Sequence, residues 1–194
     1  MNNTIHFPET VMLIDAALLN VIVTDFKKNF EKMLQRPLQP MDIAQLAVNL
    51  ALDARIPEGN KEIQVILVYD ESASKLNHSQ PSDLKTELNG VAFRDNLGEF
   101  IFASLSPENM ATREDMFFDL LHIISESTDV KRIIAVPFEQ NDKQAVHAAL
   151  EEIKGKEVTL FGMDRPEQTP SYTWQLLAYP IMQALGIKGD EITR

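Results

Sequence analysis

The chain has 194 residues, no cysteine and a formal net charge of −11, with 18 Lys and Arg against 29 Asp and Glu. Without cysteine, disulfides and thiolate chemistry are both excluded. The length suits one large domain, and we predict a single α/β domain over residues 1–194. The excess of negative charge repels phosphate backbones, so nucleic acid is disfavoured as a partner.

The sequence indicates neither a targeting segment nor a membrane segment. Residues 1–9 are polar and carry no basic stretch ahead of an apolar run. The longest apolar runs are interrupted by Asp15, Asn20 and Thr24, so they are too short to cross a bilayer. We therefore expect a cytoplasmic protein that does not enter the membrane.

The first part of the chain alternates strand and helix patterns. Residues 11–14 form a short apolar run that predicts a buried strand, which ends at Asp15. Apolar residues at helical spacing then predict two amphipathic helices, over residues 19–34 and 43–54. Residues 63–69, Ile-Gln-Val-Ile-Leu-Val-Tyr, are almost wholly apolar, which is typical of a parallel strand covered on both faces. We predict that this strand is central in the sheet.

A polar stretch and a hairpin follow the central strand. Residues 72–87 are the longest loop-like segment, and a loop of that length in a compact domain is often functional or mobile. Two β-prone runs, 91–93 and 100–103, flank the turn-forming residues 95–98. Together they predict a β-hairpin.

The last part of the chain returns to alternating helices and strands. Thr112 and Asp115 resemble a capping box, so a helix is predicted to begin there. Further strands are expected at residues 133–136 and 158–161, with a helix between them that Asn141 or Asp142 caps. A final helix is predicted from Trp174, kinked at Pro180 and ended by Gly186. This order of elements predicts a three-layer α/β sandwich with a mostly parallel central sheet plus a β-hairpin.

Several catalytic and nucleotide-binding motifs are missing from the sequence. The seven glycines match neither a dinucleotide-binding fingerprint nor a P-loop. There is no Gly-x-Ser-x-Gly elbow and no His-Glu-x-x-His zinc motif, and the four histidines are scattered. Nucleotide binding by those two routes is therefore disfavoured.

Acidic residues follow several of the predicted strands. Asp15, Asp70 and Asp164 each come at or just after a strand end. Ligands of open parallel sheets bind outside the carboxyl ends of the strands, so these carboxylates could converge on Mg²⁺ or Mn²⁺. The competing interpretation is structural, because Asp commonly follows a strand as a turn former or a helix cap.

The N-terminal third also resembles the opening of PIN-like nuclease domains. The resemblance rests on Asp15, on Asn20, on Asp42 or Asp53, and on Asp70. It implies an acidic metal site for cleaving RNA. Two features depart from that pattern: residues 16–19 are Ala-Ala-Leu-Leu where a polar site would be expected, and the net charge does not suit an RNA substrate.

Two functional hypotheses remain open. The first is a non-catalytic binding or assembly domain, with a protein partner or a second copy of the chain. It rests on the missing motifs and on Leu18, Val21 and Val23, which extend the apolar surface of the first helix beyond one stripe. Burial of that helix between sheet and loop would explain the same residues. The second hypothesis is an Mg²⁺- or Mn²⁺-dependent hydrolase that acts on a phosphorylated substrate through the strand-end carboxylates.

Overall fold

The computed structural model describes residues 6–59, 62–108, 111–138 and 143–192, and the structural statements below concern those residues. The strands are β1 (Thr10–Asp15), β2 (Met41–Asp42), β3 (Glu62–Val68), β4 (Ser79–Gln80), β5 (Ala92–Asp95), β6 (Gly98–Leu105), β7 (Arg132–Val136), β8 (Glu157–Gly162) and β9 (Thr173–Leu176). The helices are α1 (Ala16–Leu34), α2 (Ile43–Asp53), α3 (Arg113–Glu126), α4 (Lys143–Glu152), α5 (Ala178–Ala184) and α6 (Gly189–Ile192). Two short helical turns are η1 (Glu71–Ala73) and η2 (Leu84–Leu88).

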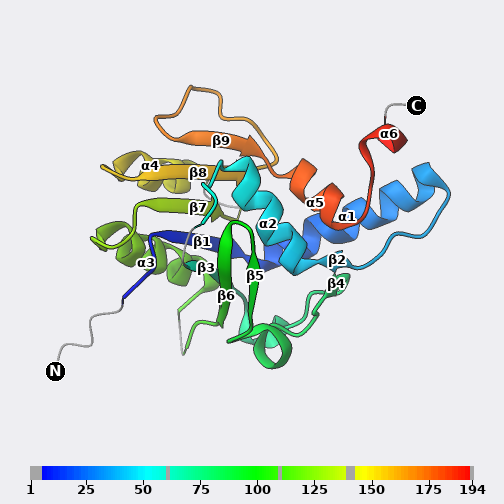
Figure 1. Cartoon of the computed structure of the whole chain (residues 1–194), viewed down its shortest axis with the longest axis horizontal. Coiled ribbons are helices and arrows are strands. Elements are labelled where there is room, and N and C mark those ends of the chain that lie inside the picture. The colour runs from blue at the N-terminus through cyan, green and yellow to red at the C-terminus, as the bar shows by residue number, and fades with distance from the viewer. Residues whose placement is uncertain (1–5, 60–61, 109–110, 139–142, 193–194) are drawn as a thin grey trace.

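A seven-stranded sheet crosses the molecule in the order β5-β6-β3-β1-β7-β8-β9, and β2 pairs with β4 in a separate small sheet (Figure 1). All neighbours in the large sheet are parallel except the β5–β6 hairpin at one edge. The prediction of a mostly parallel sheet with a hairpin is confirmed. The parallel strands follow the doubly wound order 3-2-1-4-5-6 when they are counted along the chain.

Helices cover both faces of the sheet and give it two cores. The core on one face contains buried residues of α1, α2 and α5, and the core on the other face contains buried residues of α3 and α4. Strand β3 pairs with β1 on one side and β6 on the other, and most of its side chains are buried. The predicted central position of this strand is therefore confirmed, since an apolar run loses contact with water only where both faces are covered.

The apolar surplus on α1 is directed mainly into the core. Leu18 and Val23 are buried, whereas Val21 is 55% exposed. Most of the surplus is therefore explained by packing against the sheet, and this part of α1 offers no broad apolar surface. Even though α1 is the longest helix described, no described helix is both long and apolar enough to cross a bilayer.

The predicted start of the last helix at Trp174 is wrong. Residues 173–176 form strand β9, which pairs in parallel with β8, and helix α5 begins only at Ala178. Trp174 and Leu177 are three residues apart, which is also the spacing of residues on one side of a helix. Here Trp174 lies in the strand and Leu177 immediately precedes the helix. Pro180 lies in the first turn of α5, where a missing N–H costs nothing, so it does not interrupt a longer helix.

The polar stretch at residues 72–87 is more ordered than the sequence indicates. Part of it forms η1 and η2, and β4 within it pairs with β2. The Asn77 backbone N–H donates to the Asn20 side chain at 2.9 Å, which ties the stretch to α1. The stretch is therefore a packed connection rather than an open loop.

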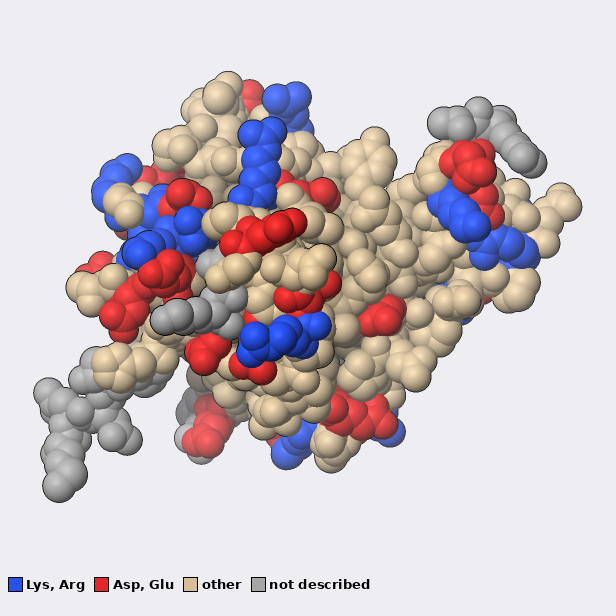
Figure 2. All heavy atoms as spheres, viewed as in Figure 1, with Lys and Arg blue, Asp and Glu red and all other residues tan. Residues whose placement is uncertain are grey.

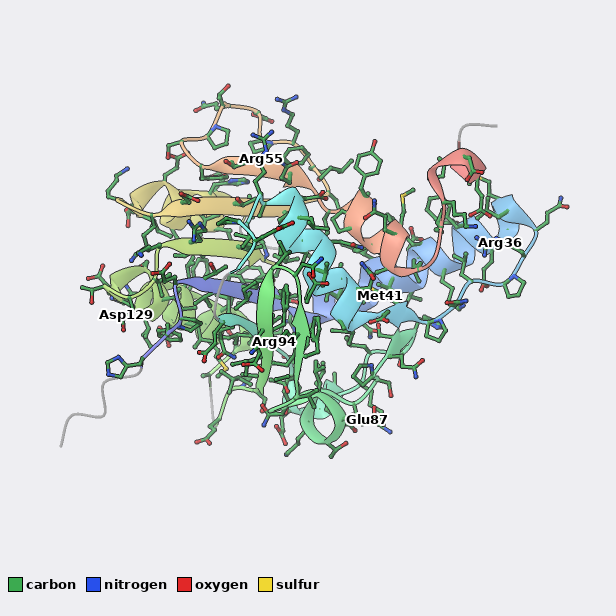
Figure 3. All side chains as sticks on the ribbon, viewed as in Figure 1. Arg36, Met41, Arg55, Glu87, Arg94 and Asp129 are labelled. Atoms are coloured by element: carbon green, nitrogen blue, oxygen red, sulfur yellow. The ribbon has the colours of Figure 1, made fainter. Side chains whose placement is uncertain are left out.

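The C-terminal segment is fastened to the far end of α1. The Arg36 guanidinium donates to both carboxylate oxygens of Glu191, each at 2.8 Å, and Figure 3 shows Arg36 beside this end of the helix. Arg36 also donates to the Gly186 carbonyl at 3.2 Å. Arg36, followed by the Lys188 backbone N–H, lowers the pKa of Glu191 to about 2.

We predict that Glu191→Gln loosens this segment and removes part of the acid sensitivity of the fold. The folded-state pKa of Glu191 lies below its ordinary value of 4.5. Its stabilising effect is therefore complete above that value and is lost as the pH falls toward about 2. Hydrogen exchange at residues 186–192 should accelerate in the variant. Glu152→Gln, at an exposed position of α4, is the control and should leave that exchange unchanged.

Candidate functional site

The carboxyl edge of the sheet is where a doubly wound fold offers a binding crevice. From β1 the chain runs outward to β3 and β6, and it then returns to the other side of β1 as β7. The connections after β1 and β7 therefore leave on opposite faces, which opens a crevice beside the ends of these strands. Asp15, the last residue of β1, lies at that point.

Asp15 is held by the start of the helix that follows it. Its side chain is fully buried, and its Oδ1 accepts a hydrogen bond from the Leu18 backbone N–H at 2.7 Å. Asp15 is thus the N-cap of α1. An extended residue with a short acidic side chain is favoured there because it satisfies an unpaired N–H and complements the positive end of the helix.

The second oxygen of Asp15 is bound by an arginine from α3. Arg113 Nε donates to Asp15 Oδ2 at 2.6 Å, and Arg113 Nη1 donates to Asp70 Oδ2. Asp70 follows the end of β3, so one guanidinium joins the ends of two neighbouring strands. We call these three side chains the Asp15–Arg113–Asp70 bridge. Both predicted carboxylates are brought together, and a cation of the chain itself lies between them.

Burial dominates the electrostatics of the bridge. The pKa of Asp15 is raised, because desolvation by burial outweighs the Leu18 N–H and the Arg113 guanidinium, and the charge of Asp70 adds to the rise. Burial also acts to lower the pKa of Arg113, but hydrogen bonds and charge from Asp15 and Asp70 outweigh it and raise that pKa. Arg113 therefore stays charged, and it is the group that compensates the buried carboxylate.

A second ion pair lies next to the bridge. Lys85 Nζ is 2.8 Å from Glu71 Oε1, and the Ser106 hydroxyl donates to the other oxygen of Glu71. Lys85 and then Ser106 lower the pKa of Glu71. These contacts attach η2 and the residue after β6 to Glu71, which follows Asp70, so Glu71, Lys85 and Ser106 form one paired group.

Asp164 lies apart from the bridge. It lines a small hollow of about 30 Å³ beyond β7 and β8, whose walls are Pro137, Phe138, Val146, His147, Leu160, Gly162 and Trp174. Within the described ranges, no group of three or more acidic or histidine side chains is placed to hold a metal ion. Asp15, Asp70 and Asp164 therefore do not converge as one set. The cap expected at Asn141 or Asp142 lies outside the described residues.

The other residues of the nuclease resemblance have local structural contacts. Asn20 Oδ1 accepts from the Asn77 backbone N–H, and Asp42 caps α2 by accepting from the Gln45 N–H at 3.0 Å. Asp53 lies at the opposite end of α2 from Asp42. Of the acidic residues named for that resemblance, Asp42 and Asp53 thus lie at the two ends of α2, and only Asp70 meets Asp15, through Arg113.

Arg113 is the residue of this site that the sequence analysis missed. The capping box predicted at Thr112 and Asp115 is confirmed, with Thr112 Oγ1 accepting from the Asp115 N–H at 3.0 Å. Arg113 is then the first residue of α3, where a positive charge opposes the helix dipole. That unfavourable charge is a local feature that sets Arg113 apart, but its partners Asp15 and Asp70 are revealed only by the fold.

We predict that Arg113→Met destabilises the protein by about 3 kcal/mol, because it leaves the buried Asp15 without its compensating charge. Denaturant unfolding followed by circular dichroism measures this change. Arg94→Met is the matched control, because it removes an arginine from an exposed ion pair. The Arg94 side chain is 74% exposed, and its Nη2 lies 3.7 Å from Glu99 Oε1. An exposed pair of this kind contributes about 0–1 kcal/mol, so equal losses in the two variants would contradict a structural role for the bridge.

The stability of the Arg113→Met variant should also depend on pH, in the opposite sense to that of a salt-bridged carboxylate such as Glu191. Without Arg113, burial acts on Asp15 unopposed and raises its pKa further. The folded state then keeps a proton that the unfolded state releases, so stability falls as the pH rises from the ordinary value of 3.8 through the raised pKa. The loss relative to the natural chain should be smaller at about pH 5 than at about pH 8.

Comparison with known proteins places the chain in a family without naming a chemistry. No curated protein and no solved structure matches it at a significant level. One family profile covers nearly the whole described length. The chain belongs to the family of unknown function DUF6621, whose profile matches residues 4–192.

Proposed function

We propose that this chain is a non-catalytic binding domain that assembles with a protein partner. The observation that carries the proposal is the Asp15–Arg113–Asp70 bridge. Both oxygens of Asp15 are already used, one by the Leu18 N–H that begins α1 and one by Arg113. A buried carboxylate that caps a helix and pairs with a half-buried arginine has a structural purpose that needs no substrate.

The surface also supports binding to a protein. Among the described residues, Tyr179 on α5 and Leu52 on α2 are 60% and 54% exposed. Large apolar side chains at the surface of adjacent helices favour a protein interface, where aromatic residues are enriched. Figure 2 shows few charged side chains over α5 and the neighbouring part of the molecule.

The second candidate function is an Mg²⁺- or Mn²⁺-dependent hydrolase of phosphorylated substrates. One observation favours it: Asp15 and Asp70 approach the same guanidinium at the binding edge of the sheet. A divalent ion between the two carboxylates could activate water or bind a phosphoryl group. It would have to displace Arg113, which is the step that separates the two proposals.

A divalent-cation titration distinguishes the two proposals. We expect millimolar MgCl₂ or MnCl₂ to leave the melting temperature of the natural chain unchanged relative to NaCl of equal ionic strength, because Arg113 already compensates Asp15. Arg113→Met should gain thermal stability from Mn²⁺, since the vacated carboxylate pair then binds cations in the folded state only. A rise in the natural chain that Asp15→Asn with Asp70→Asn abolishes would favour the hydrolase.

Nucleic acid is not the partner that we propose. A net charge of −11 disfavours the phosphate contacts on which such binding depends. Fluorescence anisotropy with labelled single- and double-stranded RNA and DNA should therefore show no binding at physiological salt. Micromolar affinity that weakens steeply with added salt would contradict this expectation.

A further inference from the structure

The two longest segments of this acidic chain without a charged residue belong to neighbouring helices. Residues 43–52 and 168–187 contain no Asp, Glu, Lys or Arg, although 24% of the chain is charged. The first segment makes up nearly all of α2, and the second contains β9 and α5. Helices at a protein surface normally alternate apolar and charged sides, so an uncharged outer side calls for an explanation.

The two helices lie against each other and form one surface, in which Asp53 at the end of α2 is the charged residue. The Asn49 side chain of α2 donates to the Pro180 carbonyl of α5 at 3.2 Å, and Asn49 itself accepts from Gln45 at 2.8 Å. Figure 1 shows α2 and α5 side by side over the same face of the sheet. We call their outer residues the α2–α5 face. Its members are half-buried or exposed: Ala44, Val48, Leu52, Ala178, Tyr179 and Gln183.

We propose that a second copy of this chain binds to the α2–α5 face, so that the protein is a two-fold symmetric dimer. This inference rests on the proposed function, since it names the partner of the binding domain. In a symmetric dimer the same face is used on both subunits and must therefore be complementary to itself. An uncharged face meets that condition, whereas an acidic or a basic face would repel its own copy.

The charge of the whole chain points in the same direction. Two copies that each carry −11 repel each other over most approaches, and an uncharged face is where this repulsion is weakest. At the C-terminal end of α2, the exposed Asp53 and Arg55 place both signs of charge beside the face. A rim with both signs is also complementary to itself, because the acid of one copy can meet the base of the other.

Sedimentation equilibrium and light scattering test the proposal. The natural chain should be a dimer at micromolar concentration. Tyr179→Asp should weaken dimerisation at least about tenfold. It replaces an exposed aromatic side chain, which we expect at the centre of the interface, by a carboxylate that meets its own copy in the dimer. Ile123→Asp is the control: Ile123 is 43% exposed on α3, which covers the opposite face of the sheet. Circular dichroism and melting curves establish that both variants fold.

A cross-linking experiment locates the interface directly, because the chain has no cysteine of its own. Gln183→Cys places a single thiol on the α2–α5 face, and Ala148→Cys places one at an exposed position of α4 on the other side of the sheet. A short bismaleimide should link Gln183→Cys into covalent dimers and leave Ala148→Cys monomeric.

Each outcome supports or overturns the dimer. A natural chain that remains monomeric at high micromolar concentration overturns it, and so does a dimer that Ile123→Asp disrupts while Tyr179→Asp does not. Preferential cross-linking of Ala148→Cys also overturns the choice of face. The cation titration tests the proposed function separately from the dimer. A stabilisation of the natural chain by Mg²⁺ or Mn²⁺ that depends on Asp15 would contradict the non-catalytic function, whatever the oligomeric state.

Discussion

The burial of one carboxylate is the constraint on which much of this structure depends. Asp15 ends the middle strand of the sheet with no exposed surface, and a charge in such a place is costly unless it is paired and hydrogen-bonded. The Leu18 N–H and Arg113 provide that pairing. Because Arg113 is 98 residues further along the chain than Asp15, the same contact fixes the start of α3 over the ends of β1 and β3.

The bridge gives a physical account of why an acidic edge need not be a metal site. In a parallel sheet the strand ends bring carboxylates together, and their mutual repulsion must be relieved by a cation or by protonation. Here a guanidinium supplies the cation and binds both carboxylates at once. Asp164 follows β8, which is separated from β1 by β7, and it lines a different hollow. The charges of Asp15 and Asp70 are thus compensated within the fold, while residues 43–52 of α2 and the whole of α5 carry no charged residue.

Local signals in the sequence were informative wherever a residue's neighbours along the chain decide its conformation. The apolar run of β3, the turn between β5 and β6, and the Thr112–Asp115 capping box are of this kind, and the structure has all three. Trp174 shows the limit of such signals. Its segment pairs with β8, and that pairing is a contact with a distant strand that local apolar spacing cannot reveal. The polar stretch between β3 and β5 is ordered in the same way, through β2 and Asn20.

The sequence by itself determined the α/β class, the central place of β3 and the location of Asp15 and Asp70 at strand ends. These features depend on the pattern of apolar and polar residues that are neighbours along the chain. Only the tertiary structure decided that these two carboxylates share Arg113 while Asp164 does not join them. It also decided that the uncharged segments of α2 and α5 meet in one surface. Both outcomes depend on strand order and on the crossing of distant segments, which are set by the packing of the whole sheet and not by any local pattern.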